Sequence, residues 1–111
     1  MNEQSNKENA VYLILNVTVK VDRSIADAWL LWLKQEYIPL VMQTNCFVSV
    51  QTVRLLEVDD ADGPTYAVQY GAESKADYLR YNELHAARLQ KISFDKWGER
   101  FIAFRSLMEV I

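Results

Sequence analysis

Two segments of the chain decide its fold, GPTYAVQY at residues 63–70 and FIAFRSLMEVI at residues 101–111. Both have the alternation of a β-strand, in which successive side chains point to opposite faces. Each also lies beside a segment with helical periodicity, so that the chain reads strand, helix, strand, strand, helix, strand. That order predicts a fold, whereas no residue pattern in the chain predicts a reaction.

Four strands are predicted, at residues 11–21, 46–58, 65–72 and 101–111. In the first strand, every second residue from Val11 to Val21 is apolar, while the residues between them are mixed and include Asn16. An antiparallel sheet of this kind covers its apolar face with helices and leaves the mixed face for solvent, a partner or a ligand. We expect the mixed face to continue through the following residues of the later strands: Ala67, Gln69, Gly71, Phe101, Ala103, Arg105, Leu107 and Glu109.

Two segments, at residues 24–43 and 74–98, have the spacing of helices. Ser24 and Ser74 are the predicted N-caps, since each hydroxyl can accept a hydrogen bond from a first-turn N–H. Pro39 predicts a kink in the first helix, and the second is expected to bend near Ser93 and to end at Gly98. The result is an α+β fold of βαββαβ order, with a four-stranded antiparallel sheet and both helices on one face.

Length and composition exclude several classes of protein. The 111 residues are enough for one domain, which we expect at residues 11–111 after a short disordered tail at residues 1–10. A net charge of −3 argues against nucleic-acid binding, which usually needs a basic stripe. No segment resembles a signal peptide or the roughly 18 apolar residues of a membrane span. The single cysteine, Cys46, cannot form an internal disulfide, which favours the cytoplasm.

No cofactor and no metal site is predicted. The segment DDADG at residues 59–63 resembles part of a calcium-binding loop. An EF-hand requires a glutamate six residues after its glycine, and this chain has Gln69 there. Cys46 has no neighbouring partner for catalysis or for metal binding, so we expect it to be structural.

Three segments carry a resemblance to a known family: WLLWLKQEYIP at residues 29–39, TYAVQY at residues 65–70 and the final strand at residues 101–111. Together they resemble an uncharacterised bacterial family known only as a domain of unknown function, over residues 12–111. The resemblance implies a ferredoxin-like fold that pairs into a dimeric α/β barrel. It implies no activity.

More distantly, the layout is similar to the antibiotic-biosynthesis monooxygenase superfamily, which includes cofactorless quinol oxygenases and haem-degrading enzymes. Haem-degrading members place a ligand histidine on the helix that corresponds to the one carrying His85, and pair it with a tryptophan and with an asparagine on the first strand. Asn16 is on the first strand here. This chain has Tyr78 and Tyr81 where the tryptophan would precede His85. The other interpretation of His85 is a half-buried side chain bonded to a neighbouring carboxylate or carbonyl.

Glu36 is a further candidate for catalysis. Helical spacing places it on the same face as Trp29, Trp32 and Leu33, and a carboxylate among apolar groups tends to have the raised pKa that a general acid or base needs. It could approach His85 if the two helices lie side by side. Alternatively, Glu36 reaches water near the helix end or pairs with an arginine.

Asn16, Gln69 and Arg105 form the candidate ligand-binding group, together with His85. Asn16, Gln69 and Arg105 are all expected to project from the mixed face. If the sheet order places the first, third and fourth strands together, they form a polar cluster inside the dimeric barrel, where Arg105 could pair with Glu109. The cluster would bind an anion or a small polar ligand, or it would form a satisfied network that fixes the register of the homodimer.

Two classes of function remain open. The first is a non-catalytic homodimer that binds a small molecule or serves in assembly, which predicts a filled core without a cavity. The second is a cofactorless or haem-dependent oxygenase-like enzyme, which predicts a cavity between the second helix and the sheet, with His85 and Asn16 pointing into it. The aromatic residues of helices and strands fit either a pocket for a planar ligand or ordinary core packing. We favour the first class, because the sequence carries no complete set of catalytic residues.

Overall fold

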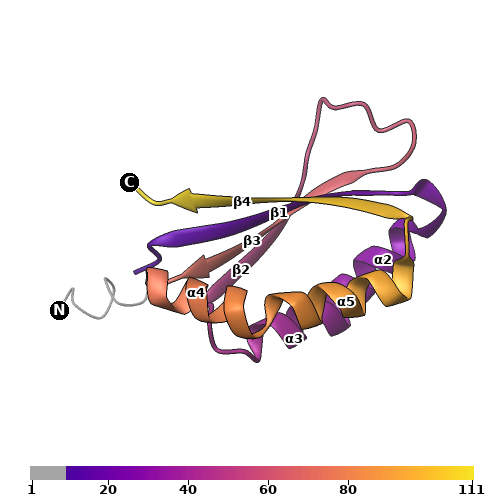
Figure 1. Cartoon of the computed structure of the whole chain (residues 1–111). Coiled ribbons are helices and arrows are strands. Elements are labelled where there is room, and N and C mark those ends of the chain that lie inside the picture. Colours follow the sequence, from indigo (N-terminus) through magenta and orange to yellow (C-terminus); the bar gives the residue numbers. More distant parts are fainter. Residues whose placement is uncertain (1–9) are drawn as a thin grey trace.

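A computed structural model describes residues 10–111, so all but one residue of the predicted tail at residues 1–10 lies outside it. Four strands form one antiparallel sheet in the order β2-β3-β1-β4, with the helices along one face (Figure 1). This is the predicted α+β, ferredoxin-like arrangement. The strands are β1 Leu13–Val21, β2 Ser49–Arg54, β3 Thr65–Ala72 and β4 Phe101–Glu109.

The first helical region has four parts: η1 Arg23–Ile25, α2 Ala26–Trp32, the π-helical turn η2 Leu33–Tyr37, and α3 Ile38–Met42. Its start differs from the prediction, since the Asp22 carboxylate caps the chain by accepting from the N–H of Ser24 at 2.8 Å. Pro39 lies in the first turn of α3, where its missing N–H is tolerated. The expected kink at Pro39 is therefore taken up by one wide turn immediately before it.

The second helical region is divided into α4 Lys75–Leu84 and α5 Ala86–Trp97. Ser74 caps α4 as predicted, with its hydroxyl accepting from the N–H of Asp77 at 3.1 Å. The break lies at His85, whose φ of −128° leaves the helical range, and not at Ser93 as the sequence suggested. Gly98 ends α5 with a positive φ of 62°, as expected.

The core lies between the helices and one face of the sheet. On β1, Leu13, Leu15, Val19 and Val21 are buried, and β3 contributes Tyr66, Val68 and Tyr70 to the same layer. The Trp29 ring stacks on Tyr66 with centroids 5.7 Å apart, so α2 is fixed directly over β3. We call this side the helix face of the sheet and the opposite side the outer face.

The register corrects the predicted orientation of the last strand. Arg105 lies directly opposite Val17, and Phe104 lies opposite Thr18. Because residues opposite each other in an antiparallel pair share a face, Arg105 belongs to the helix face. The other residues that were expected with it on the mixed face, Phe101, Ala103, Leu107 and Glu109, move to the helix face as well.

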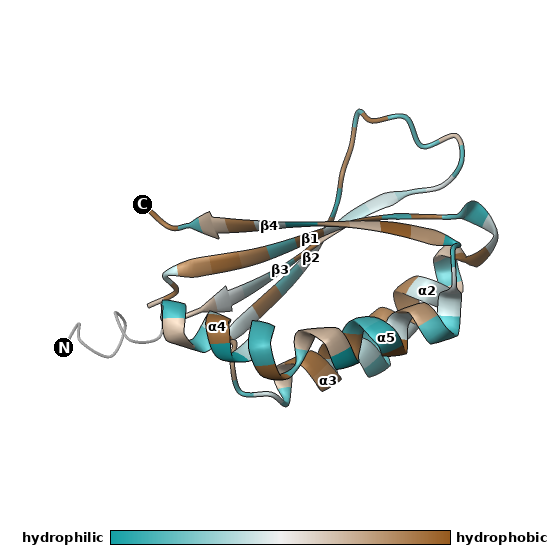
Figure 2. Cartoon of the chain, viewed as in Figure 1, coloured by the Kyte–Doolittle hydropathy of each residue, from teal (hydrophilic) through white to brown (hydrophobic). Residues whose placement is uncertain are grey.

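The outer face is nevertheless rich in apolar groups. Figure 2 shows apolar residues along much of β4, the edge strand. Its exposed members are Ile102, Phe104 and Met108, with Tyr12 and Val110 beside them. Phe104 leaves 64 % of its surface open. An apolar surface of this extent on a folded chain usually marks an interface.

The second strand is shorter than predicted, since β2 covers residues 49–54 and the residues that follow it to position 64 form the connection to β3. Over residues 10–111, none of the helices has the length and apolar character needed to cross a membrane.

Candidate functional site

The candidate site is a cavity of about 360 Å³ between the helix face of the sheet and the helices above it. Ligand pockets in proteins commonly occupy about 300–1,000 Å³, so this cavity suits a compact organic molecule. Its base is formed by aliphatic side chains of β1 and β3, namely Leu15, Val17, Val19 and Val68. The expectation of a filled core for a non-catalytic protein is therefore wrong.

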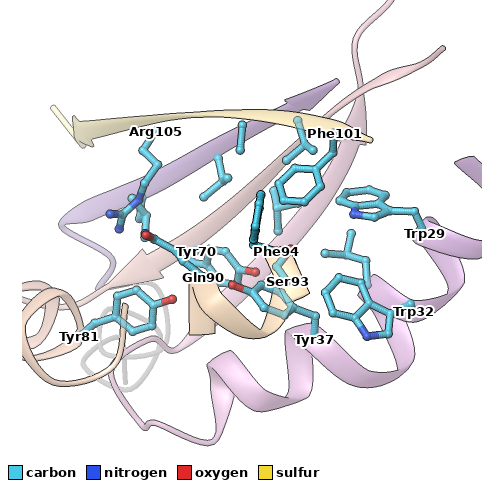
Figure 3. A pocket seen from close by; sticks show the side chains of 16 residues that line it. Trp29, Trp32, Tyr37, Tyr70, Tyr81, Gln90, Ser93, Phe94, Phe101 and Arg105 are labelled. Carbon is cyan, nitrogen blue, oxygen red and sulfur yellow. The ribbon is translucent and has the colours of Figure 1, made fainter. Parts of the chain in front are cut away.

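Aromatic rings line one end of the cavity. Figure 3 shows Trp29 and Trp32 at this end, with Phe101 of β4 and Phe94 of α5 next to them. Both tryptophans are almost completely buried, at 3 % and 6 % exposure. Trp29 stacks on Tyr66 and Trp32 packs against Tyr37 and Trp97, so the two indoles form a rigid apolar wall at this end of the cavity.

The π-helical turn determines which side chain of the first helical region reaches the cavity. The N–H of Ile38 bonds to the carbonyl of Leu33, five residues earlier, so the chain gains one residue relative to an α-helix. Tyr37 is thereby rotated onto the buried face, where its ring lies 5.0 Å from that of Trp32. Glu36 is rotated away and is exposed.

The opposite end of the cavity is polar. Figure 3 shows Arg105 and Tyr81 there, pointing toward each other from β4 and α4. The hydroxyl-bearing rings of Tyr37 and Tyr70 also line the cavity, as do Gln90 and Ser93 of α5. Three phenols and a guanidinium, all hydrogen-bond donors, thus converge on one space from the helices and the sheet.

Burial keeps these phenols in their neutral, donating form. It raises the pKa of Tyr70 and of Tyr37 far above the ordinary value, and the neighbouring phenols act in the same direction on both residues. Burial also raises the pKa of Tyr81, while the Arg105 guanidinium acts in the opposite direction. Arg105 also opposes the rise in the pKa of Tyr37, although burial outweighs it there.

Arg105 supplies the only formal charge among the cavity-lining residues of the described chain. Its predicted partner, Glu109, instead accepts a hydrogen bond from the Tyr12 hydroxyl at 2.7 Å. The three ion pairs within residues 10–111 are Arg54–Asp60, Arg80–Asp77 and Lys91–Asp95, and none of them includes Arg105. The cavity therefore carries an unneutralised positive charge in a chain whose net charge is −3.

The cavity opens between α5 and β4. The exposed members of its lining, Gln90, Phe94, Ala103 and Arg105, all come from these two elements. The residues from β1, β3 and the first helical region are buried or half-buried. A molecule can therefore enter from the β4 edge and reach the tryptophans without passing through the core.

One buried donor in the cavity wall has no partner. The indole N–H of Trp29 is buried and makes no hydrogen bond with any other described residue. Leaving a buried donor unpaired costs free energy, commonly about 1–3 kcal/mol.

The catalytic candidates named from the sequence do not meet in this cavity. His85 lies at the junction of α4 and α5, where its Nδ1 is 2.8 Å from the guanidinium of Arg88, and it is not part of the lining. Asn16 projects from the outer face, and Glu36 is exposed. The prediction that Glu36 shares a face with the tryptophans is wrong, because the π-helical turn shifts the helical phase.

Asn16 and Gln69 do lie together, opposite each other on the outer face. The Gln69 amide donates to the Asn16 side-chain oxygen at 3.2 Å, and the Asn16 amide donates to the Thr18 hydroxyl at 3.0 Å. Arg105 is on the other side of the sheet and cannot join them. Within residues 10–111, no group of three or more His, Cys, Asp or Glu side chains is arranged to hold a metal ion.

Sequence reasoning missed five polar or aromatic groups of the cavity: Tyr37, Gln90, Ser93, Phe94 and Phe101. The sequence did contain a signal for Tyr37. Pro39 makes an ordinary α-helical turn unfavourable in the residues that precede Pro39, and Tyr37 is one of those residues. The residues of α5 carried no signal, because the break at His85 resets the helical phase that the sequence pattern assumed to be continuous.

Comparison with protein families gives one match. A family model described as "Domain of unknown function (DUF4286)" matches residues 12–111, which is nearly the whole chain. It bears out the resemblance to a family known only as a domain of unknown function. A comparison with curated proteins found no match.

Solved structures share the fold at low sequence identity. A dimeric ferredoxin-like protein from an uncultured marine organism has a TM-score of 0.62 at 6 % identity, covering 91 % of this chain and 96 % of that one. A protein from Arabidopsis thaliana has a TM-score of 0.59 at 14 % identity, with coverages of 88 % and 97 %. The ActVA-Orf6 monooxygenase of Streptomyces coelicolor, in complex with nanaomycin D, has a TM-score of 0.57 at 16 % identity, with coverages of 93 % and 90 %. At these identities the similarity is one of fold.

Proposed function

We propose that this chain, which belongs to the DUF4286 family of unknown function, forms a homodimer and binds a small organic molecule between its sheet and its helices. The observation that carries the proposal is the cavity of about 360 Å³, open between α5 and β4 and lined by buried aromatic rings. A core that served packing alone would be close-packed, with few voids larger than a water molecule.

Binding without catalysis is the function that the side chains of the cavity support best. They offer apolar ring surface and hydrogen-bond donors, and within residues 10–111 no carboxylate or histidine lines the cavity. A general base needs to lie within hydrogen-bond reach of the proton that it removes. His85, Asn16 and Glu36 all lie elsewhere, so the oxygenase-like alternative has lost the residues on which it rested.

A second copy of the chain is the proposed partner for the outer face. Ile102, Phe104 and Met108 of β4 expose apolar surface there, and a symmetric dimer can cover the same patch on both copies at once. The dimeric ferredoxin-like protein from the uncultured marine organism, which has the same fold, supports this arrangement. The proposed barrel places two outer faces against each other.

The hydrogen-bonded group Asn16, Thr18 and Gln69 lies within this outer face. Polar groups buried in an otherwise apolar interface are best known for fixing register. We assign that role to this group, in place of the ligand-binding role that included Arg105.

Native mass spectrometry of gently purified protein tests the proposal. The expected result is a dimer that carries a reproducible additional mass of small-molecule size. Ala103→Phe fills the cavity from its β4 side and should abolish the additional mass, whereas Ala87→Phe, at an exposed position of α5, should retain it. An additional mass that persists in Ala103→Phe would place the bound molecule elsewhere, and a monomer would contradict the dimer.

A further inference from the structure

We propose that the molecule taken by this cavity is a planar aromatic acid, with its carboxylate at Arg105 and its ring system at the aromatic end of the cavity. This inference rests on the proposed binding function and adds the chemical class of the ligand.

The charge of the cavity selects an anion. None of the acidic side chains within residues 10–111 lines the cavity, and the single formal charge among its lining residues is that of Arg105. The three ion pairs within residues 10–111 all lie outside the cavity, and none of them includes Arg105. A guanidinium offers a planar set of N–H donors that matches a carboxylate in a two-point contact, which is stronger than a contact with a neutral acceptor.

The donors around Arg105 favour the same group. The residues Tyr37, Tyr70 and Tyr81 line the cavity, and phenols, whose ordinary pKa is about 10, are protonated donors at neutral pH. A carboxylate only accepts hydrogen bonds and has room for about four, so one guanidinium and the nearest phenols can satisfy it together. A cationic or donor-rich ligand would find no acceptor of full charge at this end.

The opposite end favours a flat ring system. Trp29 and Trp32 lie there, with Phe94 and Phe101 beside them, while Arg105 and Tyr81 mark the polar end (Figure 3). The volume of about 360 Å³ leaves room for a compact set of rings between the two ends. Contacts between aromatic rings stabilise such a complex beyond the effect of burial alone.

The mouth of the cavity is consistent with this orientation. Arg105 is exposed at the rim, beside Gln90 of α5, so the charged group of the ligand can remain near water while its rings enter. Full desolvation of a carboxylate would be costly, and this position avoids it.

Calorimetric titration of the purified protein with two matched probes tests the inference. The probes are 2-naphthoate and 2-naphthamide, which share the ring system and differ in charge. We expect 2-naphthoate to bind about tenfold more tightly or better, as a charge-assisted hydrogen bond implies. Arg105→Gln should remove this preference while leaving the affinity for 2-naphthamide nearly unchanged. Arg54→Gln, which removes an arginine outside the cavity, should keep the preference.

The outcomes separate the two proposals. Equal binding of both probes by the native protein, or a preference that survives Arg105→Gln, overturns the assignment of an acid and leaves the binding function standing. Binding of octanoate as tight as that of 2-naphthoate overturns the assignment of an aromatic ligand. If neither naphthalene probe binds the folded protein, the proposed binding function is itself contradicted, and this inference with it.

Discussion

The rings of Trp32 and Tyr37 lie with their centroids 5.0 Å apart, although the two residues are five positions apart in the sequence. In an α-helix, contacts on one face are made by residues three or four positions apart. The π-helical turn at residues 33–37 adds the extra residue, and it ends immediately before the turn that contains Pro39. One local irregularity therefore brings a phenol into the cavity and turns a carboxylate, Glu36, out of it.

Replacing the two neighbours Tyr37 and Glu36 tests this change of phase. Tyr37→Ala should lower the free energy of unfolding by about 2 kcal/mol or more, because a large ring that packs in the core is lost. Glu36→Ala should change it by less than about 0.5 kcal/mol, as an exposed position does. Urea denaturation measures both. Similar losses for the two variants would show that the helix keeps its α-helical phase.

The orientation of β4 is tested by two substitutions three residues apart. Phe104→Glu places a charge in the outer face and should convert the proposed dimer to a monomer. Leu107→Glu places the same charge on the helix face, opposite Leu15, and should leave the dimer intact. Size-exclusion chromatography with light scattering measures the mass of each. A dimer that is lost in Leu107→Glu and kept in Phe104→Glu would show that the contact lies on the other face.

The buried phenols predict a loss of stability at high pH. Burial raises the pKa of Tyr70 above its ordinary value, so the folded protein holds this proton more tightly than the unfolded chain. The resulting stabilisation is fully present below the ordinary tyrosine pKa of about 10 and is lost as the pH rises from there toward the folded pKa. The free energy of unfolding should fall above about pH 10, and Tyr70→Phe should make the fall shallower. An unchanged slope in Tyr70→Phe would contradict the burial of this hydroxyl.

Replacing His85 distinguishes a binding protein from an oxygenase-like enzyme. Because its ring is hydrogen bonded to Arg88 at the junction of α4 and α5, outside the cavity, His85→Ala should leave the affinity for 2-naphthoate within about twofold, or about 0.4 kcal/mol. Titration calorimetry on both proteins measures the change. If a folded His85→Ala variant binds 2-naphthoate tenfold more weakly or worse, His85 would have to be part of the binding site.

The fold could be predicted from the sequence because its signals are local and agree with one another. The alternation from Leu13 to Val21 identifies β1 and its buried face. The Ser74 hydroxyl and the positive φ of Gly98 mark the two ends of the second helical region, as their residue types indicate. Each of these signals depends only on residues that are close together in the sequence, so the strand and the ends of the helical region could be predicted from the sequence alone.

The face of β4 could not be predicted in the same way. Both phases of this strand are apolar, with Phe101 and Leu107 in one and Ile102 and Phe104 in the other. The choice between them is made by the pairing of β4 with β1, a contact between the two ends of the chain. Arg105 was therefore assigned to the interface, although it belongs to the cavity.

The cavity itself has no signature in the sequence. It exists because α5 stands away from β4, and because small or aliphatic side chains such as Val17 and Ala103 leave space beneath the aromatic rings. Whether neighbouring elements pack closely or leave room depends on the break at His85 and on the wide turn before Pro39. Only the assembled structure combines these two irregularities.

The most direct test of the account locates a bound molecule by nuclear magnetic resonance. In ¹⁵N-labelled protein, the indole N–H groups of Trp29, Trp32 and Trp97 give separate signals, and the first two residues line the cavity. On addition of 2-naphthoate, the indole signals of Trp29 and Trp32 and the amide signal of Arg105 should shift, while the amide signals of Asn16 and Gln69 should not. Shifts confined to the outer face, or none at all, would contradict the claim that this cavity is a binding site.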